Sequence, residues 1–247
     1  MMPAVVTPDP IVLLHGFAGT GAMWDPVAGA LGPQTAPQTP DLPGHGSRGD
    51  ARPVTFDACV AAVLAHAPPR FVLGGYSLGG RVALHVALAA PDRVSALVLV
   101  ATTAGLPGAA ARKQRRAADH ALAEAMERDG LEAFADRWTT QPLFQHDPPD
   151  AIAAQRADIA RQTPDGLAAA LRGIGTGEMA PLWDRLPELR MPVTVVVGER
   201  DAKFRTLGEQ LADGLPEAQL IVVPGAGHGL PREAPAAVAQ AIREAAG

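Results

Sequence analysis

The sequence contains very little of several residue types, and each scarcity excludes a class of protein. Its 247 residues include one cysteine, Cys59, which excludes an intramolecular disulfide and a cysteine-rich zinc module. No apolar run approaches the roughly 20 residues that span a bilayer. The first basic residue is Arg48, so no positively charged leader precedes an apolar stretch. We therefore expect a cytoplasmic protein that does not insert into a membrane.

Basic residues are fewer than acidic residues, 21 against 26. The net charge is -5, which argues against a nucleic-acid partner because such proteins usually carry a basic surface. Only two of the 21 basic residues are lysine, Lys113 and Lys203, and only 4% of residues are aromatic, with Tyr76 the single tyrosine. Hydrophobic residues nevertheless make up 47% of the chain, so it can bury a sizeable core. This length and composition suit one α/β domain.

Short apolar runs rich in β-branched residues predict the strands of a parallel sheet. Most of them are apolar at successive positions, as in strands that are covered on both faces. Helical patterns follow at residues 78–89 and 235–246, so strands and helices alternate and the predicted fold is α/β. The five runs end in glycine or in a polar turn, and they are Ile11 to Leu14, Phe71 to Leu73, Ala96 to Val100, Val193 to Val197 and Leu220 to Val223.

The middle of the chain has a different pattern. From about Gly105 to Leu186 no run predicts a strand. Residues 112–128 and 131–138 have helical patterns, a third helix is expected from Ala151, and Thr163 precedes a fourth as its N-cap. We interpret this region as a helical cap inserted between two strands, so that residues 1–104 and 187–247 form the core and residues 105–186 the cap.

The most informative motif is Gly75-Tyr76-Ser77-Leu78-Gly79, which follows a predicted strand and opens a predicted helix. This is the G-x-S-x-G pattern of a nucleophile elbow, in which small residues allow a sharp turn that exposes the serine hydroxyl at a helix N-terminus. A strand-to-helix turn that merely contains serine is the alternative interpretation. The flanking strand and helix favour Ser77 as a catalytic residue.

A serine hydroxyl needs a general base and a group that orients this base. Asp201 follows the strand at 193–197, and His228 follows the strand at 220–223. The order Ser, Asp, His is that of the α/β-hydrolase triad, and the carboxyl ends of parallel strands meet at one sheet edge. The sequence therefore predicts a triad of Ser77, Asp201 and His228, although Asp201 alone could be a helix N-cap and His228 alone a loop residue.

An oxyanion hole is expected beside this triad. The segment His15-Gly16-Phe17 follows the first strand and precedes a glycine-rich turn. The backbone N–H groups of Phe17 and Leu78 would stabilise negative charge on a substrate oxygen. His15 and His45 are interpreted as buried structural residues.

On these motifs the chain resembles the α/β-hydrolase fold over essentially its whole length. Further segments resemble the 2-succinyl-6-hydroxy-2,4-cyclohexadiene-1-carboxylate synthases of menaquinone biosynthesis. The resemblance implies a lyase that keeps the triad, abstracts a ring proton from 2-succinyl-5-enolpyruvyl-6-hydroxy-3-cyclohexene-1-carboxylate and eliminates pyruvate, with no metal or organic cofactor. The segments that carry it are residues 76–81, 134–138, 141–144, 175–177, 181–183 and 198–204.

The implied substrate carries three carboxylates, for which arginine provides a planar, bidentate donor. Arg81 lies one helical turn after Ser77 and can face the same cavity. The resemblance implies further carboxylate-binding arginines at Arg115 or Arg116 and at Arg156, and an apolar pocket wall of Tyr76, Trp138 and Phe144. Because arginine is the ordinary basic residue of this chain, each of the cap arginines could equally lie in solvent.

Other functions remain open at this stage. A carboxylesterase or C–C bond hydrolase would use the same triad, and a non-catalytic binding protein of the same fold would retain the pocket. A dehalogenase is disfavoured because its elbow nucleophile would be aspartate. The expected ligand is a small anionic molecule, and the oligomeric state, monomer or dimer, stays open.

Overall fold

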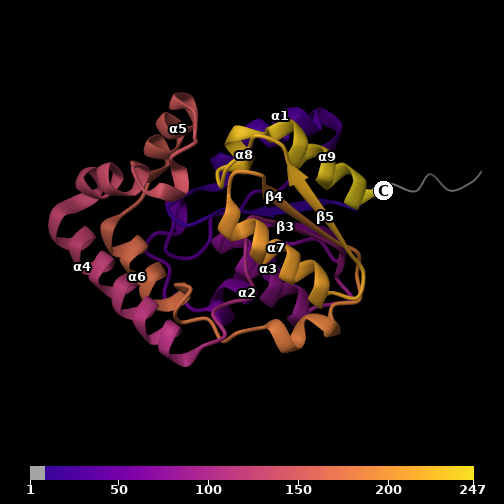
Figure 1. Ribbon diagram of the computed structural model, residues 1–247, viewed down its shortest axis with the longest axis horizontal. Helices are drawn as coiled ribbons and strands as arrows, with labels where there is room; N and C mark the ends of the chain where they lie inside the picture. Colours follow the sequence, from indigo (N-terminus) through magenta and orange to yellow (C-terminus); the bar gives the residue numbers. More distant parts are fainter. Residues whose placement is uncertain (1–8) are drawn as a thin grey trace, which may run out of the picture.

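The computed structural model describes residues 9–247 and shows a parallel sheet with helices on both faces (Figure 1). The spatial order of the strands equals their order along the chain. The strands are β1 (Ile11–Leu14), β2 (Phe71–Tyr76), β3 (Val94–Val100), β4 (Val193–Gly198) and β5 (Ala218–Val223). All neighbouring strands pair in parallel, which confirms the predicted α/β fold.

The two faces of the sheet are covered by different helices. On one face, α2 (Phe56–His66), α3 (Leu78–Ala89) and α7 (Ala202–Gly214) pack on the sheet. On the other face lie α1 (Asp25–Leu31) and α9 (Pro235–Ala246), with the short α8 (Leu230–Glu233) preceding α9. None of the helices in residues 9–247 is both long and apolar enough to cross a bilayer.

Two strands differ from the prediction. β2 does not stop at Gly74 but continues to Tyr76, because a β-carbon at Gly74 would lie 2.5 Å from the Leu13 side chain and glycine lets the strands pack closely. β5 is an edge strand, and residues such as Val222, which is 39% exposed, face solvent. The prediction that both of its faces are covered is therefore wrong, because within residues 9–247 β4 is its one neighbouring strand and side chains such as Val222 are exposed.

The predicted helices between β3 and β4 are present. They are α4 (Ala109–Thr139), α5 (Pro149–Ile159) and α6 (Pro164–Ile174), and no strand forms between residues 105 and 186. Gly130 interrupts α4 with φ +81°, a conformation that suits glycine, so the two helical stretches expected on its two sides are both found. The Thr163 hydroxyl accepts a hydrogen bond from the Gly166 N–H and caps α6 as predicted.

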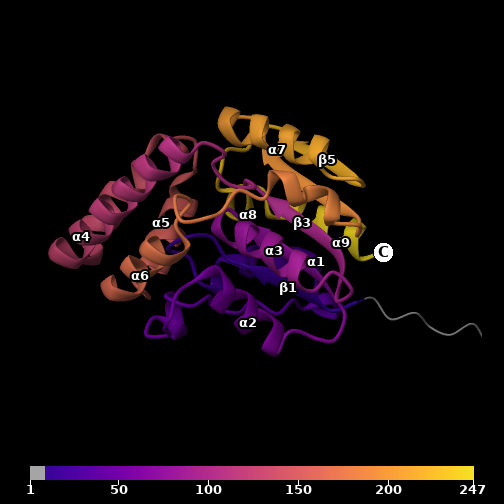
Figure 2. The same cartoon turned by 90° about the horizontal axis from the view of Figure 1, so that it is seen from below.

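These helices gather beyond one end of the sheet, and α4 and α6 lie side by side there (Figures 1 and 2). Their own apolar cluster includes Phe134, Ile159 and Leu171. We propose that residues 105–186 are the cap of a core formed by residues 9–104 and 187–247. Residues 1–8, which the sequence assigned to the core, lie outside the described residues.

Candidate active site

The three predicted triad residues follow the carboxyl ends of β2, β4 and β5. Ser77 is the first residue after β2, and Asp201 and His228 lie in the loops that follow β4 and β5. All three strands are parallel, so these loops lie at the same edge of the sheet. Ser77 and His228 line one cavity beneath the cap, and Asp201 contacts His228.

Ser77 sits in a strained turn. Its φ of 51° and ψ of -107° are rare for a residue with a side chain. The flanking glycines are required, because a β-carbon at Gly75 would lie 2.4 Å from the Gly79 carbonyl oxygen, and one at Gly79 would lie 2.1 Å from the Leu14 oxygen. The Thr102 hydroxyl, just after the end of β3, donates a hydrogen bond to the Ser77 carbonyl oxygen at 2.7 Å and stabilises this turn. The motif therefore forms the elbow that the sequence predicts.

His228 and Asp201 form a buried hydrogen-bonded pair. Nδ1 of His228 lies 2.7 Å from Oδ2 of Asp201, and the two residues are 1% and 8% exposed. With the proton on Nδ1, Nε2 of His228 is free to accept a proton. The Ser77 hydroxyl has no hydrogen-bond partner among residues 9–247. Contacts of this kind often tighten only when substrate binds.

The predicted oxyanion donors are available. Within residues 9–247, neither the Phe17 nor the Leu78 backbone N–H has a hydrogen-bond acceptor. Leu78 begins α3, so its N–H also lies at the positive end of a helix. Phe17 and Leu78 both line the cavity with Ser77. This arrangement suits the stabilisation of a negatively charged oxygen beside Ser77.

His15 and His45 have the structural role that the sequence suggests. Both are fully buried, and Nε2 of His15 accepts a hydrogen bond from the Leu42 N–H at 2.9 Å. Burial lowers the pKa of His15, and burial together with the neighbouring His15 lowers the pKa of His45 to about 3. Neither residue lines the cavity.

The cavity has a volume of about 1150 Å³, and aromatic residues surround His228 in it. Ring centroids of Tyr76, Phe144 and Phe204 lie 5.4, 6.1 and 4.4 Å from that of His228, and Trp138 lies 5.8 Å from Phe144. Tyr76, Trp138 and Phe144 are therefore where the sequence expects them. Such a wall excludes water from the triad. Among residues 9–247, no group of three or more histidine, cysteine or acidic side chains could hold a metal ion.

Two of the four expected arginines line the cavity. Arg81 is 6% exposed, and its Nη1 donates to the Ile174 carbonyl oxygen at 2.7 Å. Burial, together with the charge of Arg115, lowers the pKa of Arg81 to about 10, so it stays charged at neutral pH. Arg115 contacts Asp119 through Nε at 2.8 Å and also faces the cavity. Arg81 and Arg115 thus contribute two positive charges to the cavity lining, which also includes Asp119.

Arg116 and Arg156 lie outside the cavity lining, so Arg115 is the one of the two alternatives on α4 that lines the cavity, and the expectation for Arg156 is not met. Arg116 donates to the Gly177 carbonyl oxygen at 2.8 Å, and Arg156 pairs with Asp136 at 2.8 Å. Adjacent helical residues point about 100° apart. Of the two adjacent arginines on α4, Arg115 faces the cavity, and on α5 Gln155, the neighbour of Arg156, faces it.

Two basic residues of the cavity were missed by the sequence reasoning. Lys203 lines the cavity two residues after Asp201, and Arg232 lines it four residues after His228. Burial and the charge of Arg115 lower the pKa of Lys203. Their closeness in sequence to Asp201 and His228 was the one sequence feature that could have identified them as cavity residues. It was weak because both lie on helices whose orientation depends on packing.

Known proteins resemble the chain over nearly its whole length. A sequence profile of the alpha/beta hydrolase family matches residues 11–241. The 2-succinyl-6-hydroxy-2,4-cyclohexadiene-1-carboxylate synthase of Klebsiella pneumoniae (strain ATCC 700721 / MGH 78578) is 37% identical over 92% of this chain and 90% of its own. The same enzyme of Salmonella paratyphi C is 33% identical over 98% and 96%.

Solved structures agree with this relationship. The structure of MenH from S. aureus has a TM-score of 0.87 and 29% identity, covering 98% of this chain and 95% of that one. A thermophilic esterase from Thermogutta terrifontis, solved with malate bound, has a TM-score of 0.82 and 32% identity, covering 96% and 89%. The chain belongs to the alpha/beta hydrolase family and, within it, to the 2-succinyl-6-hydroxy-2,4-cyclohexadiene-1-carboxylate synthases.

Proposed function

We propose that this chain is a carbon–oxygen lyase that eliminates pyruvate from 2-succinyl-5-enolpyruvyl-6-hydroxy-3-cyclohexene-1-carboxylate in menaquinone biosynthesis. Its relatives of 33–37% identity carry the name of this synthase. The structural observation that supports it best is that Ser77, His228 and the buried Arg81 line one cavity, and that Asp201 is hydrogen-bonded to His228 behind them. A pocket for neutral esters has no need of a buried positive charge there.

Ser77 acts in this scheme as a base on carbon. The ring proton at C2 is acidic because the succinyl ketone lies next to it. The Ser77 oxygen takes this proton while Nε2 of His228 takes the hydroxyl proton, and Asp201 stabilises the resulting imidazolium. The electron pair of the C–H bond moves onto the ketone oxygen, and the N–H groups of Phe17 and Leu78 stabilise it there.

Elimination then completes the reaction. The enolate returns to the ketone as a C2–C3 double bond forms, the ring double bond moves from C3–C4 to C4–C5, and the C5–O bond to the enolpyruvyl group breaks. The leaving enolpyruvate takes a proton from the imidazolium of His228 and becomes pyruvate. The ring product holds double bonds at C2 and C4, as its name states, and the triad returns to its starting protonation state.

Arginines supply affinity for the anionic substrate. Arg81 and Arg115 lie close enough for their charges to interact, and Asp119 pairs with Arg115, so a substrate carboxylate beside Arg81 would supply the second negative charge for the two arginines. We assign both residues to carboxylate binding. Tyr76, Trp138 and Phe144 form the apolar wall that keeps water from the enolate.

A carboxylesterase is the second candidate, because an esterase shares 32% identity and the triad geometry serves ester hydrolysis equally well. One assay separates the two. The purified protein is given the enolpyruvyl substrate, with pyruvate measured through lactate dehydrogenase, and separately p-nitrophenyl acetate. We expect fast pyruvate release and slow ester hydrolysis; the reverse order of rates would assign the chain to the esterases.

A further inference from the structure

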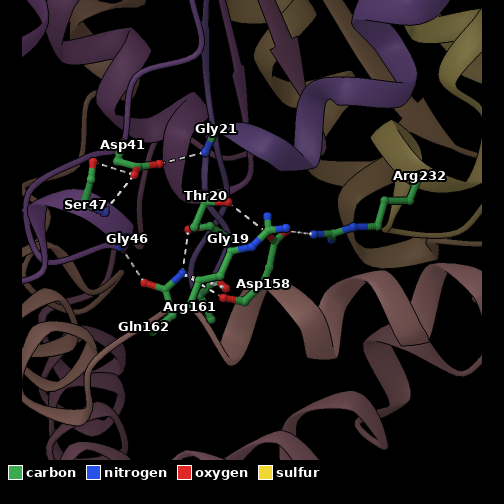
Figure 3. Close-up of polar contacts among 11 residues, drawn as sticks. Gly19, Thr20, Gly21, Asp41, Gly46, Ser47, Asp158, Arg161, Gln162 and Arg232 are labelled. Atoms are coloured by element: carbon green, nitrogen blue, oxygen red, sulfur yellow. Dashed lines mark hydrogen bonds and ion pairs between the residues drawn. The ribbon is translucent and has the colours of Figure 1, made fainter.

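Arg232 occupies a place that the proposed scheme does not use. It lies on α8, four residues after His228, and its side chain is only 9% exposed although it lines the cavity. The guanidinium pairs through Nη2 with Asp158, which lies on α5 of the cap (Figure 3). A nearly buried arginine is therefore held from the cap side while it faces the space where substrate binds.

Asp158 is itself fixed by several contacts. It is 4% exposed, and its Oδ1 accepts hydrogen bonds from the Thr20 hydroxyl at 2.7 Å and from Arg161 at 3.3 Å. Gln162, four residues after Asp158, makes a further contact with this loop, because its amide nitrogen donates to the Gly19 carbonyl oxygen at 3.0 Å (Figure 3). Asp158 thus holds Arg232 in one orientation against the loop that carries Phe17.

A contribution to folding stability does not explain why Arg232 and Asp158 form a buried ion pair. Removing two charges from water costs about as much as the pair gains, so apolar residues of the same volume would stabilise the fold equally well. Within residues 9–247, the Arg232 side chain makes no hydrogen bond other than the one to Asp158. A guanidinium carries five N–H donors, so several of them remain for a ligand in the cavity.

We propose that Arg232, oriented by Asp158, binds one carboxylate of the substrate beside His228, as a cationic position separate from Arg81 and Arg115. The inference rests on the proposed function, whose substrate has three carboxylates. The separation follows from the neighbours of each group: the charges of Arg115 and Asp119 act on Arg81, whereas the charge of Arg232 acts on Tyr76 and Asp147. Asp158 is in this scheme a positioning residue that acts through Arg232.

Arg161 offers a matched control for the test. It pairs with the same Asp158, but its side chain is 56% exposed and it does not line the cavity. Steady-state pyruvate release is measured for the wild type, Arg232→Ala and Arg161→Ala, together with the thermal unfolding midpoint of each. We expect Arg232→Ala to raise KM by about 10- to 100-fold, the loss of one charged hydrogen-bonded contact. Arg161→Ala should change KM less than twofold.

Two further variants test the contact that the Arg232 guanidinium makes. Arg232→Lys keeps the charge but not the planar fork, so its KM should lie between those of the wild type and Arg232→Ala. Added guanidinium ion should lower the KM of Arg232→Ala. The double variant D158A/R232A removes Arg232 together with the carboxylate that pairs with it, and it should show the same raised KM if the single variant does not fold.

The outcomes are distinguishable. A wild type that releases no pyruvate contradicts the proposed function itself. If the wild type is active but Arg232→Ala keeps a normal KM and only lowers the unfolding midpoint, Arg232 merely docks the cap and the inference is overturned. An equal rise in KM for Arg161→Ala would overturn it as well, because a residue outside the cavity would then have the same effect.

Discussion

Asp201 uses its two carboxylate oxygens for two different partners. Oδ2 lies 2.7 Å from Nδ1 of His228, and Oδ1 accepts a hydrogen bond from the Phe204 N–H at 3.1 Å. The second contact caps the N-terminus of α7. The sequence offered a helix N-cap and a triad acid as alternative roles for Asp201, and these contacts suit both. The N-cap hydrogen bond holds the carboxylate in position for His228.

These two roles predict different results for two substitutions at this position. Asp201→Asn can still cap α7 but cannot stabilise the imidazolium, so we expect about a 10⁴-fold lower kcat with an almost unchanged unfolding midpoint. Asp201→Ala also loses the cap and should destabilise the fold by about 1 kcal/mol. Pyruvate-release kinetics and thermal unfolding measure both effects. A fully active Asp201→Asn variant would contradict the triad assignment.

Ser77→Ala should abolish turnover without unfolding the protein. Alanine at this position keeps the strained backbone but removes the base that takes the ring proton, so kcat should fall at least about 1000-fold. Ser95→Ala is the matched control, because Ser95 lies on β3 outside the cavity. The rates are measured as pyruvate release. If Ser77→Ala retains this release, proton abstraction by Ser77 is refuted.

Arg81→Ala should weaken substrate binding more than it slows the chemistry. Arg81 is buried in the cavity wall, so its loss removes a charged contact to substrate and should raise KM about 10- to 100-fold. Arg156→Ala and Arg116→Ala are controls that lie outside the cavity and should leave KM within twofold of the wild type. Equal effects of all three substitutions would mean that general surface charge, not the cavity, attracts the substrate.

The stability of the contact between the cap and α8 should depend on pH. Asp147, which lies in the cap segment near Glu233 of α8, is the group that titrates. Burial and the carboxylate of Glu233 raise the pKa of Asp147 to about 7. Between about pH 4 and pH 7 the folded state therefore binds more protons than the unfolded state, and stability falls as pH rises through this window.

Asp147→Asn tests this dependence. The amide cannot ionise, so the fall in unfolding midpoint between pH 5 and pH 8 should be smaller than in the wild type. Asp150→Asn, a substitution of an exposed residue three positions later, is the control and should keep the wild-type fall. An unchanged fall in the Asp147→Asn variant would show that another group causes the pH dependence.

Sequence patterns predicted the sheet and the positions of the candidate triad residues because both depend on local signals. The elbow glycines at positions 75 and 79 are needed wherever a strand turns into a helix in this manner, and parallel strands bring Asp201 and His228 to the same edge. The cap helices were predicted from periodicity and from the N-cap Thr163. These features need no knowledge of how distant segments pack.

The cap arginines could not be predicted in the same way. Whether a cap arginine faces the cavity depends on the rotation of its helix, and one position changes its direction by about 100°. Arg115 faces the cavity while Arg116 does not, although the sequence treats the two alike. Arg232 and Lys203 were missed for the same reason. Their place depends on contacts between the cap, α7 and α8, which no local pattern encodes.

The central claim is that this cavity performs an elimination, and the release of pyruvate tests it most directly. Purified protein is mixed with the enolpyruvyl substrate, pyruvate is measured by coupled reduction, and the ring product is followed by the absorbance of its conjugated diene. We expect wild-type protein to form pyruvate and diene in equal amounts and Ser77→Ala to form neither above the uncatalysed rate. Hydrolysis of p-nitrophenyl acetate without any release of pyruvate by the wild type would contradict the account.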